Sequence, residues 1–258
     1  MANKPSPSAF IMVEGVSDVA FLSAYLGQIY GFRFERGSHK SDNIYSIDFY
    51  ERVVKGTPSE SLLARDETER IAIVSCDGHT SFDKAFVACV KPHFDNAPCD
   101  AKIRLVIIED ADQNESAKDS RYPSLEYSPK ELFLDDTQGW SESTNGFGTT
   151  FRYKAILCRI PYDGEGCLET IVMDSVRDSE PCIVEESVAF VDGLSEEASA
   201  HIKKRRKRVK AKAGVVFTLL NPEGTFKELT EKFEKVDCTC EAIAKQFSFL
   251  QFLKANVQ

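Results

Sequence analysis

The amino-acid sequence predicts an α/β fold in which a mostly parallel sheet carries helices on both faces and is followed by a helical C-terminal extension. Short apolar runs of strand length alternate with segments whose apolar residues recur at helical spacing. This alternation is typical of parallel strands joined by right-handed crossovers. The chain has 258 residues, of which 42% are hydrophobic, so it is long enough to bury a substantial core.

The first half of the chain contains three predicted strands and two predicted helices. In order they are a strand at 9–14, a helix at 17–30, a strand that begins at Ile71, a helix at 81–90 and a strand at 102–109. The first helix is predicted because apolar residues recur at helical spacing from Val19 onward. The stretch from Phe32 to Glu69 has no regular pattern, so we expect it to be irregular.

The second half begins with a polar excursion at 113–150, which is rich in proline and glycine and is expected to lie beside a functional site. A strand near 152–160 and a helix near 167–178 follow. We therefore predict a catalytic domain at 8–180, with insertions near 32–69 and 113–150. A mainly helical region at 185–258 is expected to contain a basic strip at 203–212.

Two acidic residues follow the first predicted strand. Glu14 lies at its carboxyl end and Asp18 in the first turn of the next helix, and Gly15 permits a tight turn between them. Open α/β sheets bind ligands at the carboxyl ends of their strands, so both carboxylates are candidates for a site. The alternative is that Glu14 is an ordinary turn residue and that Asp18 complements the helix dipole.

A second acidic cluster follows the strand at 102–109. Asp110 and Asp112 alternate along the chain, so in an extended conformation both carboxylates would point to the same side and could face one cation. Solvated loop acids are the alternative. Asp77 is a weaker candidate because Asp-Gly turns occur in any loop.

A third element, the G-x-L-E motif at 166–169, follows the strand near 152–160 and leads into the next predicted helix. A glutamate and a glycine after the first strand, a D-x-D after a later strand and G-x-L-E after a third occur here in that order. Together they resemble the Toprim domain of the OLD-like nucleases, with the closest similarity to its small stand-alone members. The chain departs from the family in the long separation between Glu14 and Asp110, which implies inserted structure.

The resemblance implies a metal-dependent endonuclease that hydrolyses phosphodiester bonds in DNA or RNA. One or two Mg²⁺ or Mn²⁺ ions would be held by carboxylates, the ligands that hard cations prefer. The candidate ligands are Glu14, Asp18, Asp110, Asp112 and Glu169. Glu14 would also act as general acid or base. OLD-like nucleases place a basic catalytic residue after G-x-L-E, and Lys210 and Lys212 are the candidates.

A partner protein is part of this prediction. OLD-type Toprim nucleases often work with an ATPase, and this chain has no match to the phosphate-binding motif G-x-x-x-x-G-K-[ST], so an ATPase would be a separate protein. The competing interpretation is a non-catalytic metal- or phosphate-sensing component of a larger nucleic-acid-processing or defence assembly.

Basic residues are concentrated in one strip although the net charge of the chain is −9. The uninterrupted run consists of Lys203, Lys204, Arg205, Arg206, Lys207 and Arg208. Such a strip attracts a phosphate backbone by counterion release, which predicts a nucleic-acid-binding element. A solvated helix face or a protein-docking segment is the alternative.

The remaining features favour a cytoplasmic protein without a membrane span. No apolar run is long enough to cross a bilayer, and the start MANKPSPS lacks the apolar stretch of a signal peptide. The eight cysteines contain no C-x-x-C pair and are expected to be reduced, mostly buried thiols. Zinc binding by Cys238 and Cys240 would require ligands from elsewhere.

Overall fold

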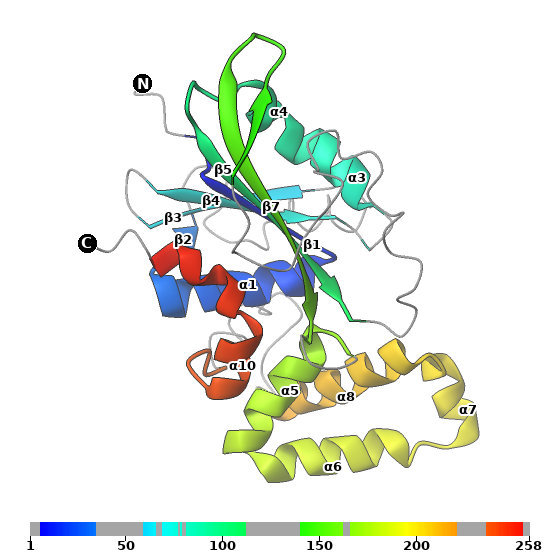
Figure 1. Ribbon diagram of the computed structural model, residues 1–258. Coiled ribbons are helices and arrows are strands. Elements are labelled where there is room, and N and C mark those ends of the chain that lie inside the picture. Colours follow the sequence, from blue (N-terminus) through cyan, green and yellow to red (C-terminus); the bar gives the residue numbers. More distant parts are fainter. Residues whose placement is uncertain are drawn as a thin grey trace. The chain divides into compact units, whose positions relative to one another are not determined.

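The computed structural model describes residues 6–34, 59–65, 69–76, 78, 81–111, 140–161, 166–220 and 236–254 (Figure 1). Its strands are β1 (Ala9–Val13), β2 (Arg33–Phe34), β3 (Ser59–Ala64), β4 (Arg70–Ser75), β5 (Lys102–Asp110), β6 (Ser141–Thr144) and β7 (Thr150–Ile160). Its helices are α1 (Val16–Tyr30), α3 (Phe82–Ala85), α4 (Lys91–Asp95), α5 (Leu168–Ser179), α6 (Pro181–Asp192), α7 (Glu196–Ser199), α8 (Arg205–Leu220) and α10 (Glu241–Gln246). Shorter helical turns are η1 (Phe86–Val90), η3 (Ala200–Ile202) and η5 (Ser248–Lys254).

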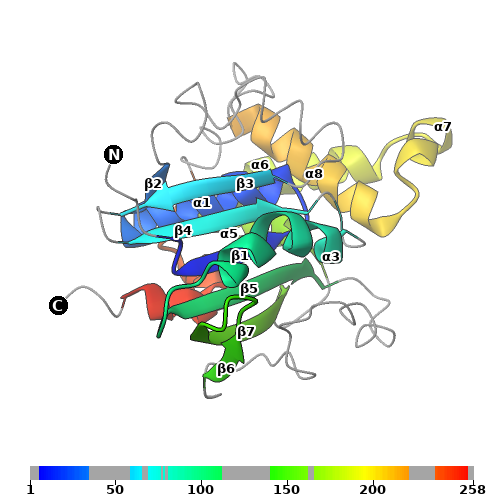
Figure 2. The same cartoon turned by 90° about the horizontal axis from the view of Figure 1, so that it is seen from above.

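The strands form one sheet in the order β2-β3-β4-β1-β5-β7-β6, as Figure 2 shows. β1 is parallel to both of its neighbours, with Ala9 opposite Ile71 of β4 and Arg104 of β5. β7 is also parallel to β5. Asp100 N donates to Thr150 O beside the start of both strands, and Ala111 N donates to Ile160 O beside the end of both. The four central strands are therefore parallel, and β2, β3 and β6 join antiparallel at the two sides.

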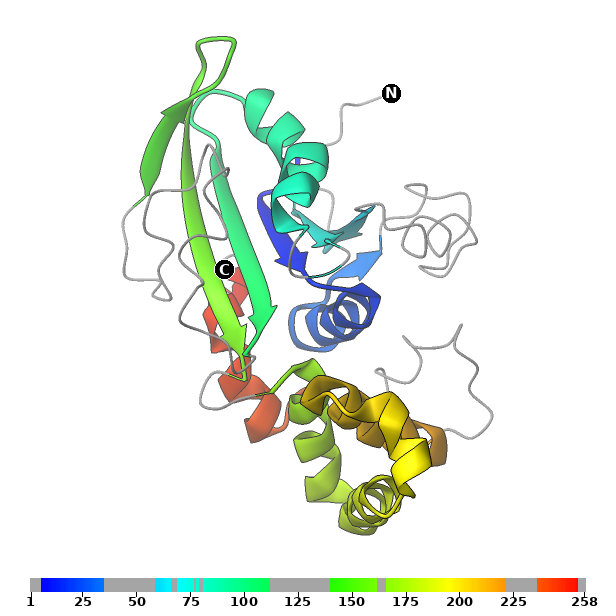
Figure 3. The ribbon, with the colours of Figure 1, turned by 90° about the vertical axis from the view of Figure 1, so that its right-hand side faces the viewer.

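The chain divides into two compact units, Met1–Glu109 with Ser116–Cys158 and Asp110–Glu115 with Arg159–Gln258. In the first unit, α1 covers one face of the sheet and the α3–η1–α4 segment covers the other (Figure 3). Alternate residues of each strand supply the two cores. Phe10 and Met12 of β1 pack with Phe86 and Phe94, while Ile11 and Val13 point to the opposite face.

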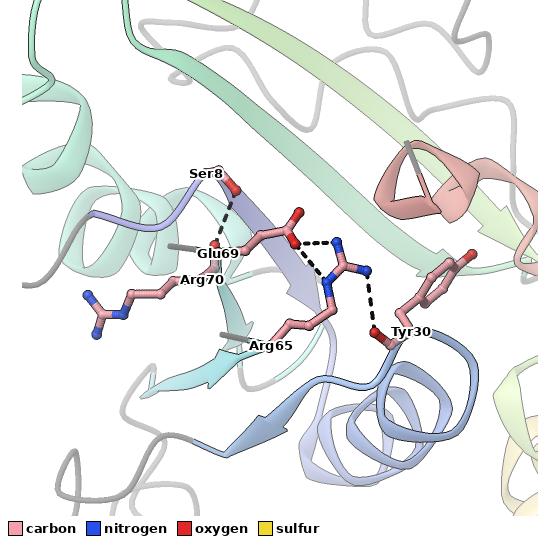
Figure 4. Close-up of polar contacts among 5 residues, drawn as sticks. All are labelled: Ser8, Tyr30, Arg65, Glu69 and Arg70. Atoms are coloured by element: carbon pink, nitrogen blue, oxygen red, sulfur yellow. Dashed lines mark hydrogen bonds and ion pairs between the residues drawn. The ribbon is translucent and has the colours of Figure 1, made fainter. Parts of the chain in front are cut away.

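A polar network joins the β3–β4 hairpin to the end of α1 (Figure 4). The guanidinium of Arg65 donates twice to the carboxylate of Glu69 and once to the backbone oxygen of Tyr30, and it stacks over the ring of Phe32. Both charged side chains are nearly buried, so the charge of each must be offset by the charge of the other. Gly31 ends α1 in the left-handed region, at φ 75°, which lets the chain turn back into β2.

The second unit is mainly helical. Helix α5 contacts α6, α8 and α10, and α6 also contacts α8. Its interior contains Val172 and Val176 of α5, Val184 of α6 and Val216 of α8. Helix α5 belongs to this unit by its contacts, whereas the predicted catalytic domain at 8–180 includes it.

The predicted fold class is confirmed: the protein is α/β, with parallel central strands, helices on both faces of the sheet and a helical C-terminal region. The expectation of an irregular stretch at 32–69 was wrong for β2 and β3, and the polar excursion at 113–150 contains β6. β3 reads SESLLA and β6 reads SEST, so neither shows the apolar alternation that predicts strands. Pairing with β4 and β7 makes them extended, and such context often overrides local propensity.

Among the residues that the structure describes, no helix is long and apolar enough to cross a membrane. All eight cysteines lie in the described part, and all are free thiols, as expected from the sequence.

Candidate functional site

Glu14 lies where the sequence predicts it, in the turn between β1 and α1. Its backbone oxygen accepts a hydrogen bond of 2.7 Å from Gly78 N, which holds the turn after β1 beside the turn after β4. Only 6% of Glu14 is exposed. A buried acid at the carboxyl edge of parallel strands is in the position where α/β sheets bind ligands.

Asp18 has a local structural role. Its Oδ2 accepts a hydrogen bond of 2.7 Å from Gly15 N, and so its carboxylate caps the first turn of α1. Burial raises the pKa of Cys76 well above its ordinary value, and electrostatic interactions with Cys89, Glu14 and Asp18 raise it further. These acids therefore lie close enough to one buried thiol to influence it, but metal binding by Asp18 stays a prediction.

In the second unit, Asp110 lies at the amino end of α5. Its Oδ1 accepts a hydrogen bond of 3.4 Å from Leu168 N, the first amide of the helix. Ala111 N donates to Ile160 O at 2.7 Å, and Gly166 N donates to Ala111 O at 2.9 Å. These bonds fix the residues after β5 against the turn that leads into α5. The D-x-D and G-x-L-E motifs thus meet through Asp110 and Leu168.

The glycine of G-x-L-E is required by close packing. A Cβ at Gly166 would lie 2.7 Å from Thr170 Oγ1 and 3.2 Å from Pro161 Cδ. A larger residue would therefore force the side chain of Thr170 or of Pro161 to shift.

Glu169 pairs with Lys210 across α5 and α8. Lys210 Nζ lies 3.1 Å from Glu169 Oε1, and the side chain of Glu169 is 13% exposed while that of Lys210 is 44% exposed. Burial raises the pKa of Glu169, but the ammonium of Lys210 and hydrogen bonds, including one from Cys167, outweigh it and leave the pKa below its ordinary value. Glu169 is therefore held as an ionised carboxylate.

Cys167 completes this cluster and was not predicted from the sequence as a site residue. Burial raises its thiol pKa far above the ordinary value, and the charges of Glu169 and Asp110 raise it further. The thiol is therefore neutral and donates to Glu169. Its position as the N-cap of α5, one residue before the motif leucine, was the available signal.

Lys212 points to a different partner. Its Nζ lies 2.8 Å from Asp192 Oδ2 at the end of α6, so this lysine links α6 to α8. Of the two candidates for the basic residue, Lys210 is the one that contacts the G-x-L-E motif.

The basic strip covers the chain just before α8 and the first turn of that helix, and Lys203, Lys204, Arg205, Lys207 and Arg208 are exposed. The side chain of Arg206 lies outside the described residues. No acidic residue lies in the first turn of α8, so the cations are placed at the positive end of the helix dipole.

The acids are hard oxygen donors, which fit Mg²⁺ or Mn²⁺ in chemistry and suit them better than a thiolate-binding ion. Within the described ranges, no group of three or more His, Cys, Asp or Glu side chains is placed to hold a metal. Asp112, the second acid of D-x-D, and Asp77 lie outside those ranges. The expectation that Glu14, Asp110 and Asp112 share one pocket stays a prediction.

Comparisons with known proteins do not identify a family. No family model matches the chain, and no curated protein matches it. One solved structure, of a hypothetical protein from Pyrococcus horikoshii OT3, aligns over 97% of this chain and 99% of that chain. The identity is 14% and the TM-score is 0.44, so no functional argument is based on it.

Proposed function

We propose that the protein is a metal-dependent nuclease that hydrolyses phosphodiester bonds in DNA or RNA, with the chemistry of the OLD-like Toprim class. The observation that supports this most is the cluster at the start of α5. There Asp110 bonds to the helix amide of Leu168, and Glu169 of the G-x-L-E motif holds Lys210 at 3.1 Å. Acids from two motifs far apart in the sequence, with one lysine, supply the residue types that phosphodiester hydrolysis needs.

The metal ligands in this proposal are Glu14, Asp110, Asp112 and Glu169, with Asp18 as a further candidate. A bound divalent ion would lower the pKa of the attacking water and offset charge on the leaving oxygen. The amide of Leu168 orients Asp110, because the hydrogen bond fixes the direction in which Oδ1 points. Glu14 would exchange the proton of the attacking water or of the leaving group.

Lys210 is the proposed catalytic cation. Its side chain is partly exposed, so its ammonium can face a phosphate while Glu169 limits where it moves. A positioned lysine stabilises the charge that develops on phosphorus in the transition state. Lys212 is bonded to Asp192, and we assign it to the packing of α6 against α8.

The basic strip is proposed to bind the phosphate backbone of the nucleic acid. The protein would act in the cytoplasm, and an ATPase partner would be a separate protein. Replacing Lys203, Lys204, Arg205 and Arg206 by glutamine should weaken binding to all sequences and flatten its salt dependence, because fewer counterions are released. An unchanged salt slope would assign the strip to solvent or to protein docking.

The test of the function is cleavage of supercoiled plasmid, single-stranded DNA and RNA with Mg²⁺, Mn²⁺ or EDTA. We expect cleavage of at least one substrate that EDTA abolishes and that the Asp110→Asn variant lacks. The alternative, a non-catalytic sensing component, predicts no cleavage and undiminished partner binding when Asp110 and Asp112 are replaced. Equal cleavage by wild type and Asp110→Asn would show that the activity belongs to a contaminant or another site.

A further inference from the structure

Four basic side chains share one face of the sheet at β5 and β7. Core residues Ile103 and Leu105 of β5 and Phe151 and Tyr153 of β7 all point to the α3–α4 side. Alternation along a strand therefore places the intervening side chains on the opposite face. These are Lys102, Arg104, Arg152 and Lys154.

The same face carries an indole. Trp140, which precedes β6, lies beneath Arg104 at 4.9 Å and Lys102 at 5.8 Å, measured from each cation to the ring centroid. Among the described residues of this face there is one carboxylate, that of Glu142, which pairs with Arg152 at 3.2 Å. The described residues of this face are therefore mostly basic, in a protein whose net charge is −9.

The β6–β7 turn is held by hydrogen bonds of Asn145 and displays an aromatic ring. Asn145 is buried, and its side-chain amide donates to Ala97 O at 3.2 Å. Its Oδ1 accepts from the backbone N–H groups of Phe147 and Thr149. This arrangement, completed by Gly148 at φ 79°, holds the turn while 78% of Phe147 stays exposed.

We propose that the β6–β7 hairpin and the start of β5 form a docking surface for single-stranded nucleic acid, here called the hairpin surface. Proteins that bind single strands combine cations for the phosphates with aromatic rings on which bases stack. Lys102, Arg104 and Arg152 supply the cations, and Phe147 supplies an exposed ring on a turn held by hydrogen bonds. Trp140 orients the cations through its cation–π contacts.

Charge complementarity and exposed aromatic area together favour a single strand over other polyanions. An acidic polypeptide would be attracted by the cations but would gain little from a ring at the hairpin tip. A duplex presents its phosphates outside and keeps its bases stacked on each other, so it offers no base to Phe147.

The hairpin surface is separate from the carboxylates of the first unit. β7 runs parallel to β5, so the tip lies at the edge where β5 begins, while Glu14 lies at the edge where β1 ends. The inference rests on the proposed function only in taking nucleic acid as the substrate. It adds that the substrate is single-stranded where it meets the hairpin.

The first test measures binding of a fluorescent single-stranded oligonucleotide and of a matched duplex by anisotropy, in EDTA so that no cleavage occurs. Phe147→Ala and Phe147→Leu should each weaken single-strand binding about tenfold, because one stacked base is lost. Phe147→Tyr should stay within about twofold of wild type, since tyrosine also stacks. Phe190→Ala, which removes another exposed phenylalanine, is the matched control and should have no effect.

The second test concerns the cations. Replacing Lys102 and Arg152 by glutamine should reduce the slope of log affinity against log salt by about 1.4, because each single-strand phosphate contact contributes about 0.7. The matched control replaces Lys84 and Lys91 of the opposite face and should leave the slope unchanged.

Three results would overturn the hairpin surface while leaving the nuclease proposal intact. They are wild-type binding by Phe147→Leu, an equal loss with Phe190→Ala, and competition by polyglutamate as strong as that by unlabelled oligonucleotide. Conversely, if the wild-type protein shows no EDTA-sensitive cleavage but binds single strands in a Phe147-dependent way, the nuclease proposal is rejected and the hairpin surface is kept. Absence of all nucleic-acid binding would reject both.

Discussion

Glu69 and Glu169 are both nearly buried and both lie beside a basic residue, but their surroundings differ. Glu69 faces Arg65, whose guanidinium also bonds to Tyr30 O and stacks on Phe32, and the two side chains are 14% and 11% exposed, Arg65 first. Glu169 faces Lys210, whose side chain is 44% exposed. The first pair lies within a network of backbone and ring contacts, whereas the second includes a cation that reaches solvent.

This difference separates a structural ion pair from a candidate catalytic one. Arg65 uses its planar donors in fixed directions, which suits the joining of a hairpin to a helix end. A lysine is a compact charge on a flexible stem, so Lys210 can adjust to a phosphate while Glu169 stays ionised. Breaking the first pair should therefore affect stability, and breaking the second should affect activity.

The largest expected effect comes from replacing Asp110, which accepts a hydrogen bond from the amide of Leu168. Asp110→Asn keeps an oxygen for Leu168 N–H but removes the charge that would bind metal. We expect cleavage to fall at least about a thousandfold, which corresponds to about 4 kcal/mol of transition-state stabilisation. The melting temperature should hold or rise, because clustered like charges repel in the absence of metal.

Asp174→Asn, on the exposed side of α5, is the control for this change and should retain activity. A large drop in the melting temperature of Asp110→Asn would mean that Asp110 is primarily a helix-capping residue.

The second effect is on the lysine itself. Lys210→Met should lower the cleavage rate about a hundredfold with little change in nucleic-acid affinity, because the lost charge acts in the transition state. Single-turnover kinetics with a saturating substrate would measure this. A change confined to affinity would instead place Lys210 with the basic strip.

The same variant has a pH signature. In the wild type the pKa of Glu169 is below its ordinary value, so its ionised form adds stability above about pH 4.3 that is lost as the pH falls. In Lys210→Met burial remains without the ammonium, so the pKa of Glu169 rises and stability is lost at neutral pH. Urea unfolding should show a difference between the two proteins that shrinks towards pH 4. A pH-independent difference would contradict the ion pair.

The third effect tests the structural pair. Arg65→Met should lower the free energy of unfolding by about 3 kcal/mol, because the Glu69 carboxylate remains buried without the guanidinium. Cleavage at 25 °C should be unchanged. Asp95→Asn, which removes a more exposed i,i+4 pair with Lys91, should cost less than about 1 kcal/mol. Similar losses in the two variants would remove the distinction between the networks.

The smallest effect is at Lys212. Lys212→Met should keep cleavage within about threefold of wild type and cost at most about 1 kcal/mol, because its partner Asp192 is half exposed. A loss as large as that of Lys210→Met would reverse the assignment of the two lysines.

Much of the central sheet was predictable because its strands are continuous apolar runs. The segment FIMV and the LVII part of KIRLVII are buried on both faces, and this requirement leaves a strong pattern in the sequence. Helix α1 was predicted because its large apolar residues recur at helical spacing, and in the structure it is buried continuously over 19–26. β3 and β6 are side strands made largely of polar residues, so only their pairing partners make them extended.

For the candidate site, the sequence alone located Glu14, Asp110 and Glu169 at the ends of strands or the start of a helix, because strand ends are marked by where apolar runs stop. It could not choose between Lys210 and Lys212, which are two residues apart. On a helix that spacing turns the side chains by about 200°, so they point to different neighbours. Only the packing of α8 against α5 and α6 decided that Lys210 meets Glu169 and Lys212 meets Asp192.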